Sequence, residues 1–259
     1  MYRNAYQMQR DIELLLDKVK SARYLNSTYA QALNIAQTRL ILDRVDNIKR
    51  RGGYSFESSQ RVRDELAPLV EPLTAATVVT NVVTKPTNYW MGVLVQVTVN
   101  SKTNYARPIT YNELPAILGE DFAEPLDDYP VYAENENGIQ LYTGSTNATA
   151  CNLLYLHKPT KIVISDTSIA AGATAVTVGL RYAVDTSSTV THNSVVYSEA
   201  DDFVAVNTAT AGGSVILITN TELADPIHYE LIKIAASILS GQQENYNEKN
   251  ILEQEIQRS

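Results

Sequence analysis

Residues 93–99 read Val-Leu-Val-Gln-Val-Thr-Val, and this stretch identifies the middle of the chain as β-structure. Valine occupies every second position, and Leu94, Gln96 and Thr98 stand between the valines. Successive side chains of a strand point to opposite faces, so one face of this strand is apolar and the other is mostly polar. The alternation predicts a half-buried strand in a sheet that covers a core on one side.

Strand-forming residues continue on both sides of this stretch. From Thr74 to about Thr219, β-branched and aromatic residues dominate and turn residues recur at short intervals. The Asn-Gly step of residues 135–138 favours a tight hairpin between residues 130–132 and 139–142, because it readily adopts positive φ. Further strands are expected at residues 153–157, 161–165, 175–180, 194–206 and 214–219. Together they predict a β-sandwich or a barrel-like body.

Helical spacing precedes this β-rich stretch. A first helix with one apolar face is predicted by Met8, Ile12, Leu15, Leu16 and Val19. A second helix follows the capping run at residues 26–28, continues for about seven turns and stops at residues 52–53. Its apolar positions are Tyr29, Leu33, Ala36, Leu40, Ile41, Val45 and Ile48. A shorter helical pattern runs from Ser58 to Ala67 and ends at Pro68.

Helix returns after the strands. Asp225 and Pro226 form a start signal, and an apolar stripe then runs to Gly241 through Ile227, Leu231, Ile234, Ala235 and Ile238. A last, mostly polar helix is expected over residues 243–258. The sequence therefore predicts an α+β fold, in which N- and C-terminal helices pack together and carry an inserted antiparallel β-sandwich or barrel-like domain. The expected boundaries are residues 1–73 for the N-terminal helical region, 74–220 for the β-rich domain and 221–259 for the C-terminal helices that complete the helical domain.

Composition limits the classes of partner. The 259 residues are 44% hydrophobic, which is enough to bury the core of one large domain or two modest ones. The formal net charge is -8, and lysine and arginine are scattered apart from residues 49–51. Proteins that bind duplex DNA specifically usually concentrate basic residues on one face. We therefore expect no tight binding to nucleic acid.

The N-terminal segment, the length of the apolar stretches and the single cysteine allow predictions about localisation and thiol chemistry. The N-terminal segment lacks the apolar core of a signal peptide, and no stretch approaches the length of a membrane span. We expect the protein to be made and assembled in the cytoplasm, without a membrane partner. The single cysteine, Cys151, stands beside apolar residues and is expected to be a buried, inert thiol.

Motifs that carry chemistry are missing from the sequence. There is neither a phosphate-cradling Gly-x-x-x-x-Gly-Lys-Ser/Thr run nor a Gly-x-Ser-x-Gly elbow. His157, His192 and His228 are far apart, and none has a second histidine or a cysteine at metal-ligand spacing, so a packing role is favoured for each. We predict no catalytic residues, no metal site and no cofactor.

Two groups of residues leave alternatives open. The acid pairs at residues 127–128 and 201–202 could in principle support glycoside hydrolysis, although adjacent acids in turn-like sequence are usually solvated loop residues. The chain also has 16 tyrosines against one tryptophan and three phenylalanines. Tyrosine suits protein contacts and equally suits stacking against sugars, and it is also a common strand residue.

Several short stretches resemble the head-to-tail connector proteins of tailed phages. Residues 153–162 read Leu-Leu-Tyr-Leu-His-Lys-Pro-Thr-Lys-Ile, and residues 221–228 read Thr-Glu-Leu-Ala-Asp-Pro-Ile-His before a helix that contains Ala235-Ala236. In that family a Tyr-Leu-x-Lys-Pro strand leads to a Glu-Leu-Pro-x-x-x-His start of a C-terminal helix. Ala224 stands where the family often has proline, and Pro226 partly offsets this departure. Residues 107–114 and 128–132 are similar to the versions found in crAss-like phages.

The resemblance implies a virion structural protein rather than an enzyme. It implies a ring, commonly of twelve copies, in the neck between capsid and tail, where the ring contacts the portal, an adjacent neck ring or tail proteins. Terminal helices would then contact neighbours, and DNA would pass through the channel as non-specific cargo. An acidic channel wall suits this task because it lets DNA slide. A carbohydrate-binding or adhesin-like β-module stays the alternative, and a hydrolase has no set of residues to support it.

Overall fold

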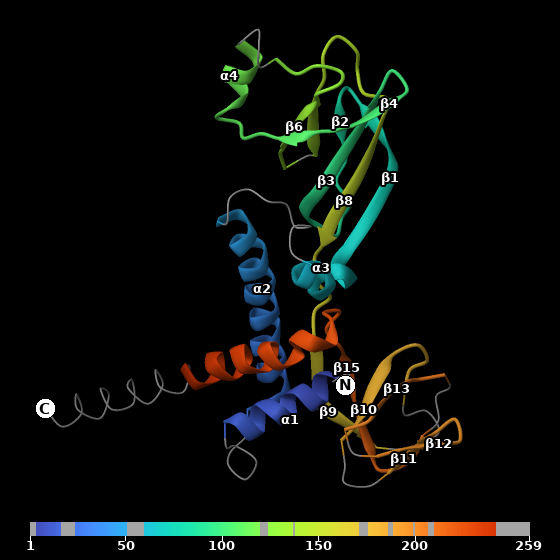
Figure 1. Cartoon of the computed structure of the whole chain (residues 1–259). Coiled ribbons are helices and arrows are strands. Elements are labelled where there is room, and N and C mark those ends of the chain that lie inside the picture. The colour runs from blue at the N-terminus through green and yellow to red at the C-terminus, as the bar shows by residue number, and fades with distance from the viewer. Residues whose placement is uncertain are drawn as a thin grey trace, which may run out of the picture. The chain divides into compact units, whose positions relative to one another are not determined.

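The computed structural model describes residues 4–16, 24–50, 60–119, 124–136, 138–170, 176–185, 189–198, 200–206 and 210–241, without the side chains of residues 46–50. The chain divides into two compact units. Unit 1 combines residues 1–68 with residues 159–259, and unit 2 is the continuous segment 69–158. The fold is mixed α+β, with terminal helices and a large, barrel-like sheet (Figure 1).

Most of the described helices belong to unit 1. They are α1 (Ala5–Leu15), α2 (Asn26–Arg50), α3 (Gln60–Leu66), a 3-10 turn (Asp225–Ile227) and the helix over residues 228–241. The start of α1 is fixed by a capping box, because the Asn4 side chain accepts from the backbone N–H of Gln7 at 2.8 Å while Gln7 accepts from the Asn4 N–H at 3.2 Å. The length of α2, 25 residues, agrees with the predicted seven turns.

Two small sheets complete unit 1. The four-stranded sheet has the order β13-β10-β15-β9 and consists of β13 (Asp202–Val204), β10 (Arg181–Val184), β15 (Ser214–Thr219) and β9 (Val163–Ala170). The three-stranded sheet has the order β12-β11-β14 and consists of β12 (Val195–Tyr197), β11 (Val190–His192) and β14 (Ala211–Gly212). All of these pairings are antiparallel.

The main core of unit 1 lies between its helices and the four-stranded sheet. Met8, Ile12 and Leu33 from the first two helices are fully buried there, together with Leu231 from the C-terminal helix and Ile216 from β15. The described N- and C-terminal helices therefore pack together, as predicted. A smaller cluster around Phe203 joins the two sheets.

Unit 2 is built around one eight-stranded sheet with the order β4-β3-β8-β1-β2-β7-β6-β5. Its strands are β1 (Val70–Val79), β2 (Val82–Val83), β3 (Tyr89–Val99), β4 (Lys102–Tyr105), β5 (Arg107–Pro108), β6 (Val131–Glu134), β7 (Ile139–Tyr142) and β8 (Ala150–His157). Val95, Val97 and Val99 of β3 are buried, as the alternation predicted. A short helix, α4 (Leu114–Gly119), also belongs to this unit.

The predicted domain boundaries need correction. Residues 74–220 were expected to form one β-rich domain, but the inserted unit covers residues 69–158, and the strands from β9 to β15 belong with the terminal helices. The physical reason is that β9, β10 and β15 bury Ile164, Ala183 and Ile216 in the same core as the helices. The strand β1 also starts at Val70, inside the region 1–73 that was expected to be helical.

Some local predictions also change. The segment 176–180 is a turn, and the strand expected at 175–180 begins at Arg181 instead. The strand expected over 194–206 is divided into β12 and β13. In α1 the expected apolar face loses Leu15, whose side chain is exposed, whereas Met8 and Ile12 are buried. The predictions for Val19, for residues 52–53 and for the helix 243–258 lie outside the described residues.

The predicted hairpin of β6 and β7 is confirmed. A Cβ atom at Gly138 would stand 2.5 Å from the carbonyl oxygen of Val83 on β2. Glycine is therefore required here by the close approach of a neighbouring strand. Asn137 lies outside the described residues.

Candidate functional site

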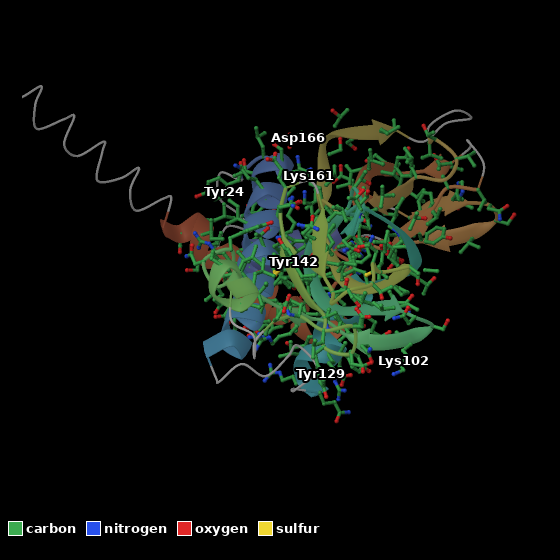
Figure 2. All side chains as sticks on the ribbon, turned by 90° about the horizontal axis from the view of Figure 1, so that it is seen from above. Tyr24, Lys102, Tyr129, Tyr142, Lys161 and Asp166 are labelled. Atoms are coloured by element: carbon green, nitrogen blue, oxygen red, sulfur yellow. The ribbon has the colours of Figure 1, made fainter. Side chains whose placement is uncertain are left out.

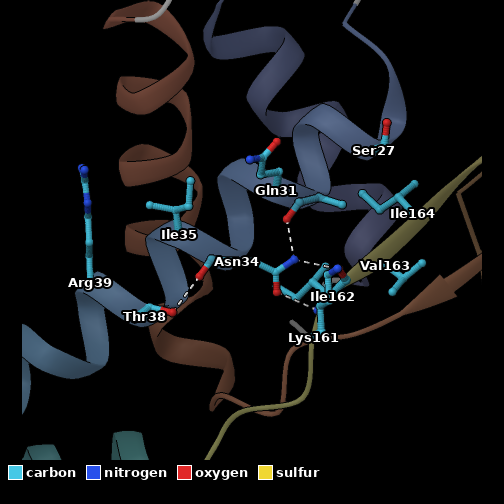
Figure 3. A pocket seen from close by; sticks show the side chains of 11 residues that line it. Ser27, Gln31, Asn34, Ile35, Thr38, Arg39, Lys161, Ile162, Val163 and Ile164 are labelled. Carbon is cyan, nitrogen blue, oxygen red and sulfur yellow. Dashed lines mark hydrogen bonds between the residues drawn. The ribbon is translucent and has the colours of Figure 1, made fainter.

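A groove of about 630 Å³ runs between α2 and β9 in unit 1 (Figure 3). One wall is formed by side chains of α2, and the other is residues 161–164. Its floor is largely aliphatic, because it includes Ala30, Ile35 and Val163. We call this feature the α2–β9 groove.

Asn34 fixes the geometry of the α2–β9 groove. Its side-chain amide donates to the carbonyl of Ile162 at 2.8 Å and accepts from the N–H of Ile162 at 2.9 Å (Figure 3). β9 is an edge strand, so the backbone groups beside it have no neighbouring strand to pair with. The amide of Asn34 takes the place of that neighbour and satisfies both polar groups of a buried residue.

A second contact holds the other end of the groove. Asn26 donates to the carbonyl of Ser165 at 2.7 Å, and the N–H of Ser27 donates to the Asp166 carboxylate at 2.9 Å. The hydrogen bonds from Ser27 hold the pKa of Asp166 below its usual range. These bonds join the first turn of α2 to β9, so the groove is a rigid feature.

The rim of the groove is positively charged. Arg39 on α2 and Lys161 beside β9 line it, and both are exposed. Neither cation forms an ion pair with another described residue. In a chain of net charge -8, an aliphatic floor with two such cations suits an apolar group that carries a carboxylate.

A turn in unit 2 exposes apolar side chains together with a carboxylate, whereas the rim of the groove carries cations. In the turn of residues 126–129, Leu126 is 55% exposed and Tyr129 is 74% exposed, and the Asp128 carboxylate between them is also exposed. Figure 2 labels Tyr129 and also Lys102, whose ammonium group lies 3.5 Å from the Asp128 carboxylate. We call this feature the 126–129 turn.

Asp127 holds the 126–129 turn in place. Its carboxylate accepts from the Asn100 amide at 3.2 Å and from the N–H of Thr146 at 3.4 Å, and its carbonyl accepts from Asn104 at 3.1 Å. A Cβ atom at Gly144 would come within 3.0 Å of the same carboxylate. The exposed side chains of this turn therefore stand on an ordered base, which is unusual for a surface loop.

The three histidines lie inside the fold. His157, His192 and His228 are all buried. The His192 ring stacks on Phe203 with centroids 4.6 Å apart, and its Nε2 accepts from the N–H of Val206 at 3.1 Å. The His228 Nε2 lies 3.0 Å from the carbonyl oxygen of Leu223. No group of side chains with the composition of a metal site occurs among the residues that the structure describes.

The acid pairs and the cysteine are also built into the framework. Asp201 accepts from the N–H of Ser198 at 2.8 Å, and Asp202 pairs with Arg181 and accepts from the Asn4 amide at 3.1 Å. The 127–128 pair organises the turn described above. Cys151 is fully buried, and burial raises the pKa of its thiol to about 11. The acid pairs therefore have partners within the fold, and the cysteine lies in its core.

The tyrosines divide into two populations in unit 2. Tyr89 and Tyr155 stack with centroids 5.6 Å apart inside the sheet, and burial is the main reason that the pKa of Tyr132 rises to about 12. Tyr105 and Tyr111 are exposed, as Tyr129 is. The buried tyrosines belong to the core of unit 2. The exposed tyrosines are available for contacts with other molecules.

Sequence reasoning did not single out the residues that shape these features. Asn34 sits inside the apolar pattern of α2, and a polar residue on the inner side of a helix is the signal that could have marked it. Arg44 was also missed, although it joins three helices through ion pairs with Glu65 at 2.8 Å and Glu230 at 2.5 Å. Their partners lie far away in sequence, and one sequence carries no information on such pairs.

No known protein family matches this chain, and no curated protein matches it in sequence. None of the described helices is long and apolar enough to cross a membrane.

Proposed function

We propose that the chain is a structural subunit of a tailed-phage particle that forms a ring in the neck, between the portal and the tail. In this proposal the chain acts through contacts with identical copies and with neighbouring neck proteins. The resemblance of residues 153–162 and 221–228 to connector proteins supplies the family, and with it the expectation of about twelve copies.

The observation that carries the proposal is the exposure of large apolar side chains on ordered elements of both units. In unit 1 they include Val195 and Val196 on β12, which are 50% and 61% exposed. In unit 2 they include Tyr105 on β4 and the two apolar residues of the 126–129 turn. Such side chains, held by regular structure, favour protein contact over free exposure to water.

The polar residues support the same proposal. The described acids and histidines that could carry chemistry have hydrogen-bond or ion-pair partners in the framework, as shown for Asp127, Asp202 and His192. An assembly subunit needs such partners because they keep its contact surfaces rigid.

The purified full-length chain tests the proposal most simply. Mass measurement and negative-stain microscopy are expected to show annular oligomers, either of the chain alone or after the portal protein is added as a template. A chain that stays monomeric under both conditions contradicts the proposal.

A carbohydrate-binding or adhesin-like module is the second candidate, and the exposed tyrosines of unit 2 favour it. Tyr105, Tyr111 and Tyr129 could stack against sugar rings. Saturable binding of a glycan by a monomeric chain, lost when Tyr129 is replaced by serine, would favour this alternative over the ring.

A further inference from the structure

The α2–β9 groove and the 126–129 turn complement each other. The groove offers an aliphatic floor and two cations that lack described ion-pair partners. The turn offers two exposed apolar side chains that flank the Asp128 carboxylate, which is exposed and lies 3.5 Å from the Lys102 ammonium group of the same copy. Both are rigid in the free chain, because Asn34 fixes the groove and Asp127 fixes the turn.

We propose that the 126–129 turn of one copy docks into the α2–β9 groove of the next copy. This inference rests on the proposed function, because it assumes that copies of the chain meet. The turn and the groove are different surfaces on different units, so this contact can repeat from one copy to the next in head-to-tail order. Repeated head-to-tail contacts close into a ring when the rotation between copies allows it.

The roles of the side chains follow from their chemistry. Leu126 and Tyr129 cover the floor near Ile35 and remove apolar surface from water on both partners. Asp128 approaches the rim cations and sets the register of the turn in the groove. Because hydrogen bonds already hold the backbone of both surfaces, the loss of conformational entropy on binding is confined to the exposed side chains.

Disulfide trapping tests the contact directly. The full-length variants Thr38→Cys and Tyr129→Cys are mixed and mildly oxidised, since Thr38 lines the groove and both positions are exposed. The native Cys151 does not interfere, because its thiol is buried and its raised pKa keeps it protonated. The matched control replaces Tyr129→Cys with Val196→Cys, whose position is 61% exposed and lies on β12.

Charge reversal gives a second, independent readout. Arg39→Glu combined with Lys161→Glu is expected to weaken self-association at least tenfold, and so is Asp128→Lys alone. A chain with all three substitutions restores the opposite charges in reversed order and is expected to recover most of the affinity. All three positions are exposed, and circular dichroism checks that the variants stay folded.

The outcomes separate this contact from the ring itself. A heterodimer from the Thr38 and Tyr129 pair, well above the Val196 control, together with charge-reversal rescue, supports the docking. Rings that form while the cysteine pair stays unlinked, or that ignore the charge reversals, overturn the docking and leave the proposed function standing. If neither rings nor the heterodimer form, with the portal protein present, both fail.

Discussion

The two units are stabilised in different ways. Unit 2 is one continuous segment that contains two-residue hairpins at Thr80-Asn81 and Asn100-Ser101 and a longer connection, with α4, between β5 and β6. Unit 1 joins two segments of the chain through side chains from distant positions, such as Asn34 with Ile162 and Arg44 with Glu230. In unit 1, polar contacts between distant segments therefore add to an apolar core that the two segments share, whereas unit 2 is organised around the backbone ladder of its eight-stranded sheet.

The chain offers a separate probe for each unit. The single tryptophan, Trp90, lies in β3 of unit 2, so its fluorescence reports the unfolding of that unit. Most described helical residues belong to unit 1, so the far-ultraviolet helical signal reports mainly on unit 1. Substitutions can then be assigned to the unit that they affect.

The largest expected effects come from two glycines, one in each unit. Gly212 has φ +80°, and a Cβ there would stand 2.4 Å from the Thr189 carbonyl oxygen. Gly212→Ala should lower the free energy of unfolding by about 3 kcal/mol, because strain and a backbone clash add. Gly138→Ala should cost about 2 kcal/mol, because only the clash applies.

The two units should respond separately to these substitutions. Gly212→Ala should shift the helical transition and Gly138→Ala the Trp90 transition in denaturant. Gly119→Ala is the matched control, since a Cβ there meets no atom within 4 Å, and it should change neither transition measurably. Equal shifts of both signals by each variant would show that the two units unfold as one.

The difference between the units also explains what could be predicted from sequence. The alternation of residues 93–99 and the apolar spacing of Met8, Ile12 and Leu33 reflect local periodicity, and the corresponding strand and helices are present. The domain boundary was wrong because composition shows that residues 159–220 form strands but not which core those strands cover. The groove was missed for the same reason, since Asn34 meets Ile162 only in the folded chain.

The contact between the Asn34 side chain and the backbone of Ile162 fixes the groove. Asn34→Ala removes both hydrogen bonds to Ile162. The backbone N–H and carbonyl of this buried residue then lose the partners that Asn34 supplied. We expect a loss of about 2 kcal/mol from unit 1, seen in the helical transition, while the Trp90 transition stays unchanged. Thr38→Ala, one turn further along α2, is the control and should cost much less. A loss confined to unit 2 would contradict the role of Asn34.

The smallest expected effect is a dependence on pH. Burial raises the pKa of Glu65, but hydrogen bonds from Arg61 and Arg44 outweigh it, so the pKa of Glu65 in the folded chain lies below its ordinary value. This contribution to stability is therefore complete above the ordinary pKa of about 4.3 and is lost as the pH falls through the lower, folded value.

Glu65→Gln checks this contribution. The substitution should lower the stability of unit 1 by about 1 kcal/mol at pH 7, since the charge-assisted hydrogen bonds from Arg44 and Arg61 weaken. The acid-dependent part of the helical transition should become flatter in the variant. An unchanged acid profile would mean that other carboxylates in unit 1 control it.

The central proposal is that rigid exposed surfaces hold identical copies of the chain together in the neck of a phage particle. A reconstruction of the intact particle tests this proposal most directly. The account predicts density for a closed ring between portal and tail, in which each copy contacts the next. Purified particles that lack the chain, or that hold it as isolated copies without mutual contact, would contradict the account.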